Sequence, residues 1–167
     1  MPLELLHTNP NLSISYDNKN NWLYLEWQGE QTLTKVRKSC LLIAQCFLQR
    51  SYTRVLNDNS NVTSYTREVF AWLSSDFLPY MHLAHIEYVA WVFIPEIDKQ
   101  FYTNIALYKD SSPIVALFED LASAYSWLRD VTFKPVAKTN SIQTTAQKRL
   151  ELESRVAMGK SFVVSAP

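Results

Sequence analysis

The chain has 167 residues, of which 47% are hydrophobic and 19% are charged, a composition that indicates one folded domain with a tail and excludes a disordered protein. Its only two glycines, Gly29 and Gly159, exclude a glycine-rich phosphate-binding loop. The formal net charge is zero, which argues against nucleic-acid binding. The charge is uneven, because residues 1–131 carry 10 basic and 14 acidic side chains, net −4, and residues 132–167 carry 6 basic and 2 acidic, net +4.

No stretch has the features of a signal peptide, and none reaches the roughly 18 uncharged residues that a membrane helix requires. We therefore expect a cytoplasmic protein with no membrane span. Cys40 and Cys46 fall in one predicted helix, where six residues at ~1.5 Å each separate their Cα atoms by about 9 Å, too far for a disulfide. Both are expected to be reduced and buried.

Three strands are predicted first. Residues 3–7 form a short edge strand. Residues 12–16 alternate between apolar and polar side chains, which is typical of a half-buried strand, and residues 22–27 are mostly apolar. The turn-forming residues 17–21 join the second and third strands, so this pair is predicted to be an antiparallel hairpin.

A helix is predicted next, from a cap at Thr32 or Thr34 to about Gln49. Its second half is apolar nearly all round, so we expect neighbours to cover it on more than one side. Residues 54–58 form the following strand, which ends in Asn57-Asp58 before a polar turn.

Residues 66–80 are predicted to be a second helix, capped by Ser64 or Thr66. The most apolar strand covers residues 86–93, and a third helix follows over residues 95–108, with a proline in its first turn. Residues 114–118 form the last strand. Glu119 or Asp120 opens the last helix of the domain.

The predicted element order is β-β-α-β-α-β-α-β-α, which indicates an α/β domain over residues 1–131 with a mixed, mostly parallel sheet of four to five strands and helices packed on it. Residues 132–167 form a basic linker and tail, in which residues 145–158 are expected to form a short helix ended by Gly159. The apolar positions of this helix are too sparse for a stable lone helix of ~14 residues, so we expect it to bind something or to fray.

The hairpin, the strand ending in Asp58, the turn with Val62 and the sequence FEDLASAYSWL together resemble the STAS-like group over residues 11–130. This is the fold of anti-sigma-factor antagonists and of small bacterial proteins labelled STAS/SEC14-like. The resemblance implies a phosphorylatable serine, followed by Ser-Gly, at a helix start. Here the corresponding stretch NVTSYTREVF places Thr66 or Arg67 nearest and has no Ser-Gly, so the switch serine is absent. Ser64 and Thr66 remain as candidate acceptors.

The stretch that follows the 54–58 strand is the candidate interaction loop. In open α/β sheets, ligands and partners usually sit at the carboxyl ends of the strands, where we expect Asp58. The candidate residues are Asp58, Asn59, Ser60, Ser64, Thr66, Arg67 and Trp72. The alternative is structural: Asp58 and Asn59 form turn hydrogen bonds, and Ser64 or Thr66 caps the next helix.

No catalytic signature is present. His82 and His85 are three residues apart, as two metal ligands on a helix would be, but they lack an acidic or cysteine partner nearby, so a role at a helix end is favoured. The cysteines lie in an apolar helix that does not stabilise a thiolate. No G-x-S-x-G motif occurs. We therefore expect no enzyme, metal or cofactor.

The first functional hypothesis is a non-enzymatic protein-interaction or regulatory module that binds a protein partner or associates with itself. The second is a carrier of a small apolar, lipid-like ligand, held in a cavity of a few hundred Å³. Its expected lining is Trp22, Phe70, Trp91 and Phe101. The third is an enzyme of unknown class, for which the groups to check are Asp58, Glu68, His82 and His85. Among the aromatic residues, Trp72 and Tyr80 are expected to be the most exposed.

Overall fold

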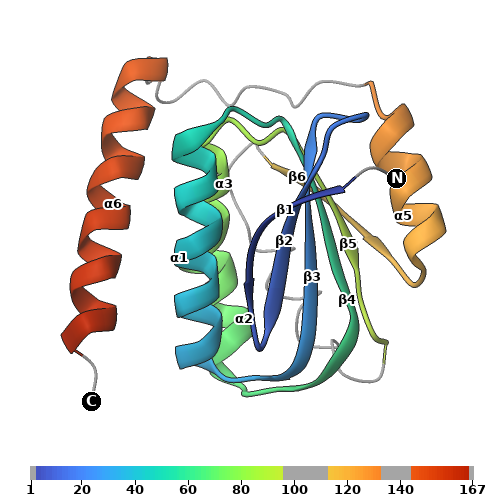
Figure 1. Ribbon diagram of the computed structural model, residues 1–167, viewed down its shortest axis with the longest axis horizontal. Helices are drawn as coiled ribbons and strands as arrows, with labels where there is room; N and C mark the ends of the chain where they lie inside the picture. Colours follow the sequence, from blue (N-terminus) through green and yellow to red (C-terminus); the bar gives the residue numbers. More distant parts are fainter. Residues whose placement is uncertain (1–2, 96–112, 133–143, 166–167) are drawn as a thin grey trace.

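The computed structural model describes residues 3–95, 113–132 and 144–165, the last five of them as backbone only. Six strands form one sheet in chain order (Figure 1). The first three strands pair antiparallel and the remaining pairs are parallel, which confirms the mixed, mostly parallel sheet. The edge strand predicted over residues 3–7 is part of the sheet, which therefore has six strands where four to five were expected. The strands are β1 (Leu3–Asn9), β2 (Leu12–Asp17), β3 (Trp22–Gln31), β4 (Arg54–Tyr65), β5 (Tyr88–Val92) and β6 (Ile114–Phe118).

Helices cover both faces of this sheet (Figure 1). One face carries α1 and a continuous helical segment of residues 68–83, the other carries α5, and α6 lies outside α1. The predicted helix 95–108 lies outside the described residues. The helices are α1 (Leu33–Gln49), α2 (Glu68–Trp72), the π-helix η1 (Leu73–Phe77), α3 (Leu78–Leu83), α5 (Leu121–Asp130) and α6 (Thr145–Ser165).

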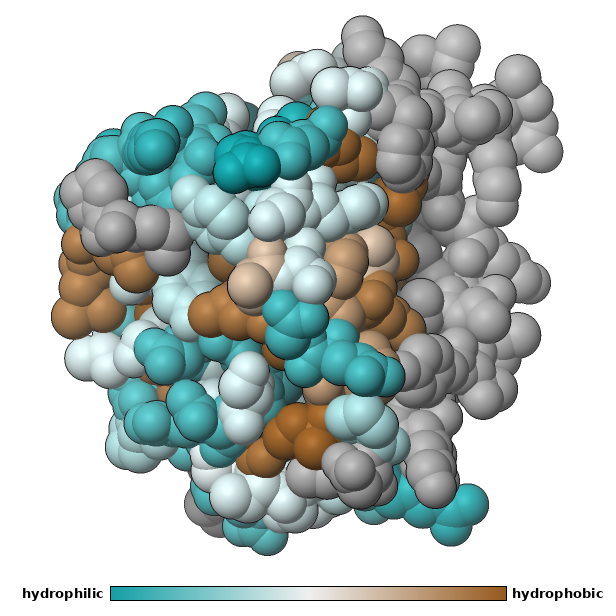
Figure 2. Space-filling model, turned by 90° about the vertical axis from the view of Figure 1, so that its right-hand side faces the viewer, coloured by the Kyte–Doolittle hydropathy of each residue, from teal (hydrophilic) through white to brown (hydrophobic). Residues whose placement is uncertain are grey.

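The two faces of the sheet bury separate apolar clusters. Successive residues of a strand point to opposite faces, so β4 directs Val55 towards α1 and Leu56 towards α5. The larger cluster lies under α1 and segment 68–83, and the smaller one joins the sheet to Ala124 and Leu128 of α5. Figure 2 shows the α5 side of the molecule, where apolar side chains form separate patches between hydrophilic ones.

Side-chain caps fix two of the helix starts. The Thr32 side chain accepts a hydrogen bond from the Lys35 amide and begins α1, and Asp120 accepts one from the Ser123 amide and begins α5. Thr32 and Asp120 were each one of two predicted candidates. Both caps satisfy amide groups that the first helical turn cannot pair internally.

Segment 68–83 begins later than predicted and changes pitch in its middle. Ser64 lies in β4, and Arg67 precedes α2 without a side-chain cap, so the predicted cap at Ser64 or Thr66 was wrong. The π-helix η1 comes just before Pro79, whose ring lacks an N–H and would clash with the carbonyl four residues earlier in a regular α-helix. The wider turn accommodates that proline, and π-turns are frequent at functional sites.

The two histidines belong to a helix C-terminus. His85 adopts φ 62°, while the Ile86 amide donates to the Met81 carbonyl at 3.0 Å and the His85 amide donates to the His82 carbonyl at 3.1 Å. This pair of hydrogen bonds is the Schellman ending of a helix, in which the left-handed residue is usually glycine. His82 and His85 therefore lie where the helix-end interpretation placed them.

The C-terminal helix α6 packs on the body instead of fraying (Figure 1). Leu152 and Val156 are buried in the same cluster as Met81 of α3. Gly159 does not end the helix, which corrects the prediction. A Cβ atom at Gly159 would approach Leu41 Cδ1 to 3.1 Å, so glycine permits α6 to lie close to α1. None of the described helices is both long enough and apolar enough to span a membrane.

Candidate functional site

Strand β4 does not end at Asp58, which corrects the predicted polar turn. Its pairing with β5 stops where Asp58 faces Val92, but β4 continues beside β3 to Tyr65. A bulge interrupts the β3 pairing just after Asp58. Turn-type side chains satisfy the backbone at this place: Asp58 accepts from the Ser60 amide at 2.9 Å, and the Asn59 side chain donates to the Val92 carbonyl at 2.8 Å.

Asp58 is an internal residue on the α5 face, not an accessible group at the rim of the sheet. Its side chain accepts a hydrogen bond from the Tyr24 hydroxyl at 2.9 Å, and Asp58 is only 4% exposed. Burial, and then the negative charge of Asp58, raise the pKa of Tyr24 far above its ordinary value. Within the candidate loop, Asp58 and Asn59 are therefore enclosed by their own chain.

The other candidate residues are accessible to different degrees. Ser60, Ser64 and Arg67 are exposed, whereas Thr66 and Trp72 are half-buried. Trp72 lines a large pocket between helices, whereas Asn59 lines a separate void of about 10 Å³. The candidate residues therefore do not converge on one site.

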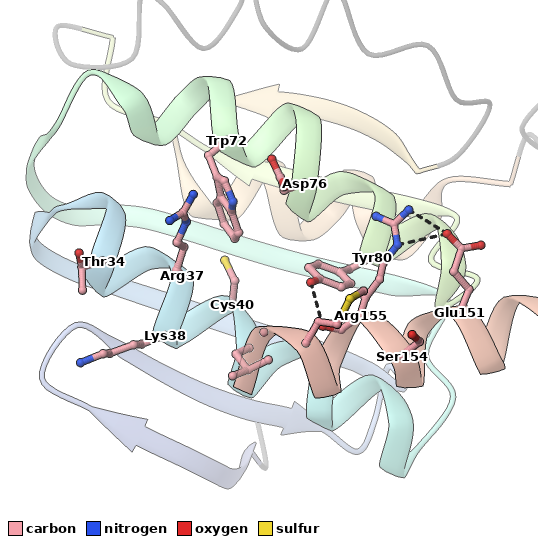
Figure 3. A pocket seen from close by; sticks show the side chains of 13 residues that line it. Thr34, Arg37, Lys38, Cys40, Trp72, Asp76, Tyr80, Glu151, Ser154 and Arg155 are labelled. Carbon is pink, nitrogen blue, oxygen red and sulfur yellow. Dashed lines mark hydrogen bonds and ion pairs between the residues drawn. The ribbon is translucent and has the colours of Figure 1, made fainter. Parts of the chain in front are cut away.

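A half-open groove of about 660 Å³ lies between α1, segment 68–83 and α6 (Figure 3). Each of the three helical elements forms part of its wall, so residues far apart in the sequence meet there. The lining residues are Thr34, Arg37, Lys38, Cys40, Leu41, Trp72, Asp76, Tyr80, Glu151, Ser154, Arg155, Met158 and Gly159.

Two aromatic rings of the groove lie beside arginine side chains (Figure 3). The guanidinium carbon of Arg37 is 5.7 Å from the centroid of the Trp72 ring, and that of Arg155 is 5.9 Å from the Tyr80 ring. Both distances are within the range of cation–π attraction. Trp72 also stacks on Phe77 with centroids 6.3 Å apart, which holds the indole in place.

The charges of the groove are unevenly compensated. Arg155 forms an ion pair with Glu151 at 2.8 Å, one helical turn away. Asp76 accepts a short hydrogen bond from the Ser75 hydroxyl. Arg37 and Lys38 are exposed on α1 and form no ion pair with any residue that the structure describes. The α1 side of the groove is therefore its positive side.

Cys40 contributes a thiol to the groove but not a reactive one. Burial raises the pKa of Cys40 well above its ordinary value, so the thiol is neutral at physiological pH. Cys40 and Cys46 are both free and buried, as predicted. In the described part of the chain, no group of three or more His, Cys, Asp or Glu side chains is arranged to hold a metal ion.

The described residues of the predicted ligand cavity do not surround one common space. Trp22 belongs to the cluster on the α5 face, whereas Phe70 and Trp91 belong to the opposite face, so the sheet separates them. Phe101 lies outside the described residues. The void lined by Trp91 has a volume of about 10 Å³, roughly that of one water molecule. Space for a ligand exists outside the sheet layers, in the groove.

The fold and the groove define the chain as an α/β domain with a mixed six-stranded sheet and a groove between α1, segment 68–83 and α6. No known protein family and no curated protein matches the sequence. The structure is similar to that of an uncharacterized protein from the DUF3478 family with a SpoIIAA-like fold from Shewanella loihica PV-4. The similarity covers 74% of this chain and 98% of that one, with 19% identity and a TM-score of 0.48. It concerns the fold and transfers no residue, ligand or partner.

Proposed function

We propose that the chain is a non-enzymatic STAS-like interaction module of a bacterial-type cytoplasm, and that the groove receives a segment of a protein partner. The observation that carries this proposal is the arrangement of Trp72 and Tyr80, half-buried and each beside an arginine. Tryptophan, tyrosine and arginine are the residue types that dominate the energetics of protein interfaces.

The groove is also held in shape before a partner arrives. The Trp72 ring stacks on the buried Phe77, and the Tyr80 hydroxyl donates to the Arg155 carbonyl at 3.4 Å, which ties segment 68–83 to α6. Side chains that are already ordered lose less conformational freedom on binding, so more of the contact energy appears as affinity.

The test is affinity capture from an extract of the source organism with the full chain, comparing wild type with Trp72→Ala. Trp127→Ala is the matched control, because Trp127 is also half-buried but packs against Tyr88 and Phe118 at the α5 side. We expect a specific protein that the wild type and Trp127→Ala retain and that Trp72→Ala loses. Equal capture by all three proteins would contradict the proposal. Light scattering on the purified chain tests whether the partner is a second copy.

A small apolar ligand is the second candidate for the same groove. A volume of about 660 Å³ lies within the ~300–1,000 Å³ range of small-molecule sites. Native mass spectrometry of the protein purified without denaturation should then show an added mass that Trp72→Ala does not retain. A spectrum with the mass of the bare chain for both proteins would contradict this candidate.

A further inference from the structure

We infer that the groove selects an acidic segment of its protein partner, with one apolar side chain in the groove and neighbouring carboxylates against Arg37 and Lys38. This inference rests on the proposed function and adds the chemistry of the partner to it. It follows from the uneven distribution of charge around an apolar centre.

The positive side of the groove is the edge of α1. Arg37 and Lys38 are adjacent, exposed and without an ion-pair partner in the described ranges, whereas the nearby Lys35 is 3.6 Å from Glu30. The adjacent Thr34 adds a hydroxyl that can donate a hydrogen bond. Two uncompensated cations beside a hydroxyl favour carboxylate oxygens.

The opposite side of the groove, formed by segment 68–83 and α6, directs the carboxylates of the partner towards α1. The charge of Arg155 is already balanced by Glu151, and the Asp76 carboxylate on segment 68–83 repels an acidic partner residue. An acidic segment therefore binds in one orientation, with its carboxylates away from Asp76. Like-charge repulsion of this kind contributes to specificity.

The centre of the groove receives the apolar side chain. Leu41 of α1, Trp72 of α2 and Met158 of α6 line it from three elements. Met158 is 62% exposed, which leaves apolar surface for a partner to cover. An aliphatic or aromatic side chain of the partner placed there removes its own apolar surface and that of the three lining residues from water. The neighbouring residues of the partner then lie near Arg37.

The test is a selection of random peptides displayed on phage, with the full chain as the immobilised target. We expect the enriched peptides to contain an apolar residue flanked by Asp or Glu. Their binding should weaken roughly tenfold or more for the double variant Arg37→Glu, Lys38→Glu, because two exposed attractions to the peptide carboxylates become repulsions. Lys35→Glu, on the same helix but outside the groove, should change binding less than about twofold.

Two further variants separate the inference from the proposed function. Trp72→Ala and Met158→Ala should both weaken the selected peptides, and the exposed Met158 makes its variant safe for folding. Enriched peptides that depend on Trp72 but are neutral or basic would overturn the acidic preference while leaving the proposed function intact. Peptides that bind all variants equally, or no enrichment at all, would overturn the inference and would also contradict the groove as the binding site of a protein partner. Binding of sodium dodecanoate, in place of any peptide, would overturn it in favour of a small ligand.

Discussion

Replacing Asp58 by alanine is expected to destabilise the fold by about 3 kcal/mol. The carboxylate accepts hydrogen bonds from the Tyr24 hydroxyl at 2.9 Å, the Ser60 amide at 2.9 Å and the Ser60 hydroxyl at 2.5 Å. A hydrogen bond to a charged group contributes roughly 1.5–3 kcal/mol, but a buried carboxylate costs several kcal/mol of desolvation. The net loss of stability is therefore smaller than the sum of the three hydrogen bonds. It includes the cost of leaving the Tyr24 hydroxyl buried without an acceptor.

The assay is urea unfolding followed by tryptophan fluorescence and by circular dichroism. Tyr24→Phe should cost about 1–2 kcal/mol, and the double variant should cost less than the sum of the two single variants by roughly 1 kcal/mol, because the two groups share one hydrogen bond. Asp76→Ala, an exposed aspartate, is the control and should stay within about 0.5 kcal/mol. Additive costs, or a change below about 0.5 kcal/mol for Asp58→Ala, would refute the buried hydrogen bond.

Other predictions concern α6 and the end of α3. Leu152→Asp should release α6 from the body, because it places a charge at a site that is 2% exposed. Limited proteolysis should then remove the tail of this variant. Leu150→Asp is the control: its site is 66% exposed, and its tail should stay as resistant to protease as that of the wild type. His85→Gly should raise the free energy of unfolding by up to ~1 kcal/mol, since glycine adopts the left-handed conformation without strain; a loss of stability in urea would contradict this. The pKa of His85 is lowered by burial, and then by the charges of Lys148 and His82, so the unfolded state binds the proton more readily. The free energy of unfolding should therefore be highest above the ordinary histidine pKa of 6.5 and should fall as the pH drops through that value. Asparagine tolerates the same backbone conformation but does not titrate, so His85→Asn should lose less stability than the wild type between pH 7.5 and 5.5.

Sequence patterns were sufficient where the signal was local. The strand Ile114–Phe118 and the cap at Asp120 lie within a few residues of each other, and both have the predicted positions. The overrun of β4 was missed because Asn57 and Asp58 are typical turn residues. Their side-chain oxygens accept hydrogen bonds from distant partners: the Trp27 indole N–H donates to Asn57 at 2.9 Å, and the Tyr24 hydroxyl donates to Asp58. Such pairing across thirty or more residues overrides local turn propensity.

The groove could be predicted only in part, for a similar reason. Trp72 was selected from the stretch after β4, and Tyr80 was expected to be exposed. Arg37 and Lys38 were missed, because cations on the outer side of an amphipathic helix usually face solvent. Arg37 and Lys38 line a groove only because α6 lies next to α1. The position of α6 relies on Gly159 and on the buried pair Leu152 and Val156. The sequence did not reveal this position, because a glycine in a helix pattern ordinarily indicates the end of the helix.

The dependence of the groove on α6 links binding to the docking of the tail. Ser154, Arg155 and Met158 complete the wall, so a partner segment in the groove contacts α6 as well as the body. A ligand that binds only the form with α6 docked stabilises that form by RT ln(1 + [L]/Kd). In a variant that undocks α6, the apparent affinity for the same ligand falls in proportion to the fraction of molecules in which α6 remains docked. Leu152→Asp should therefore lower the affinity for a selected peptide although Leu152 does not line the groove, and the peptide should in turn protect the wild-type tail from protease. A peptide that binds Leu152→Asp with full affinity would show that α1 and segment 68–83 form the site without the tail.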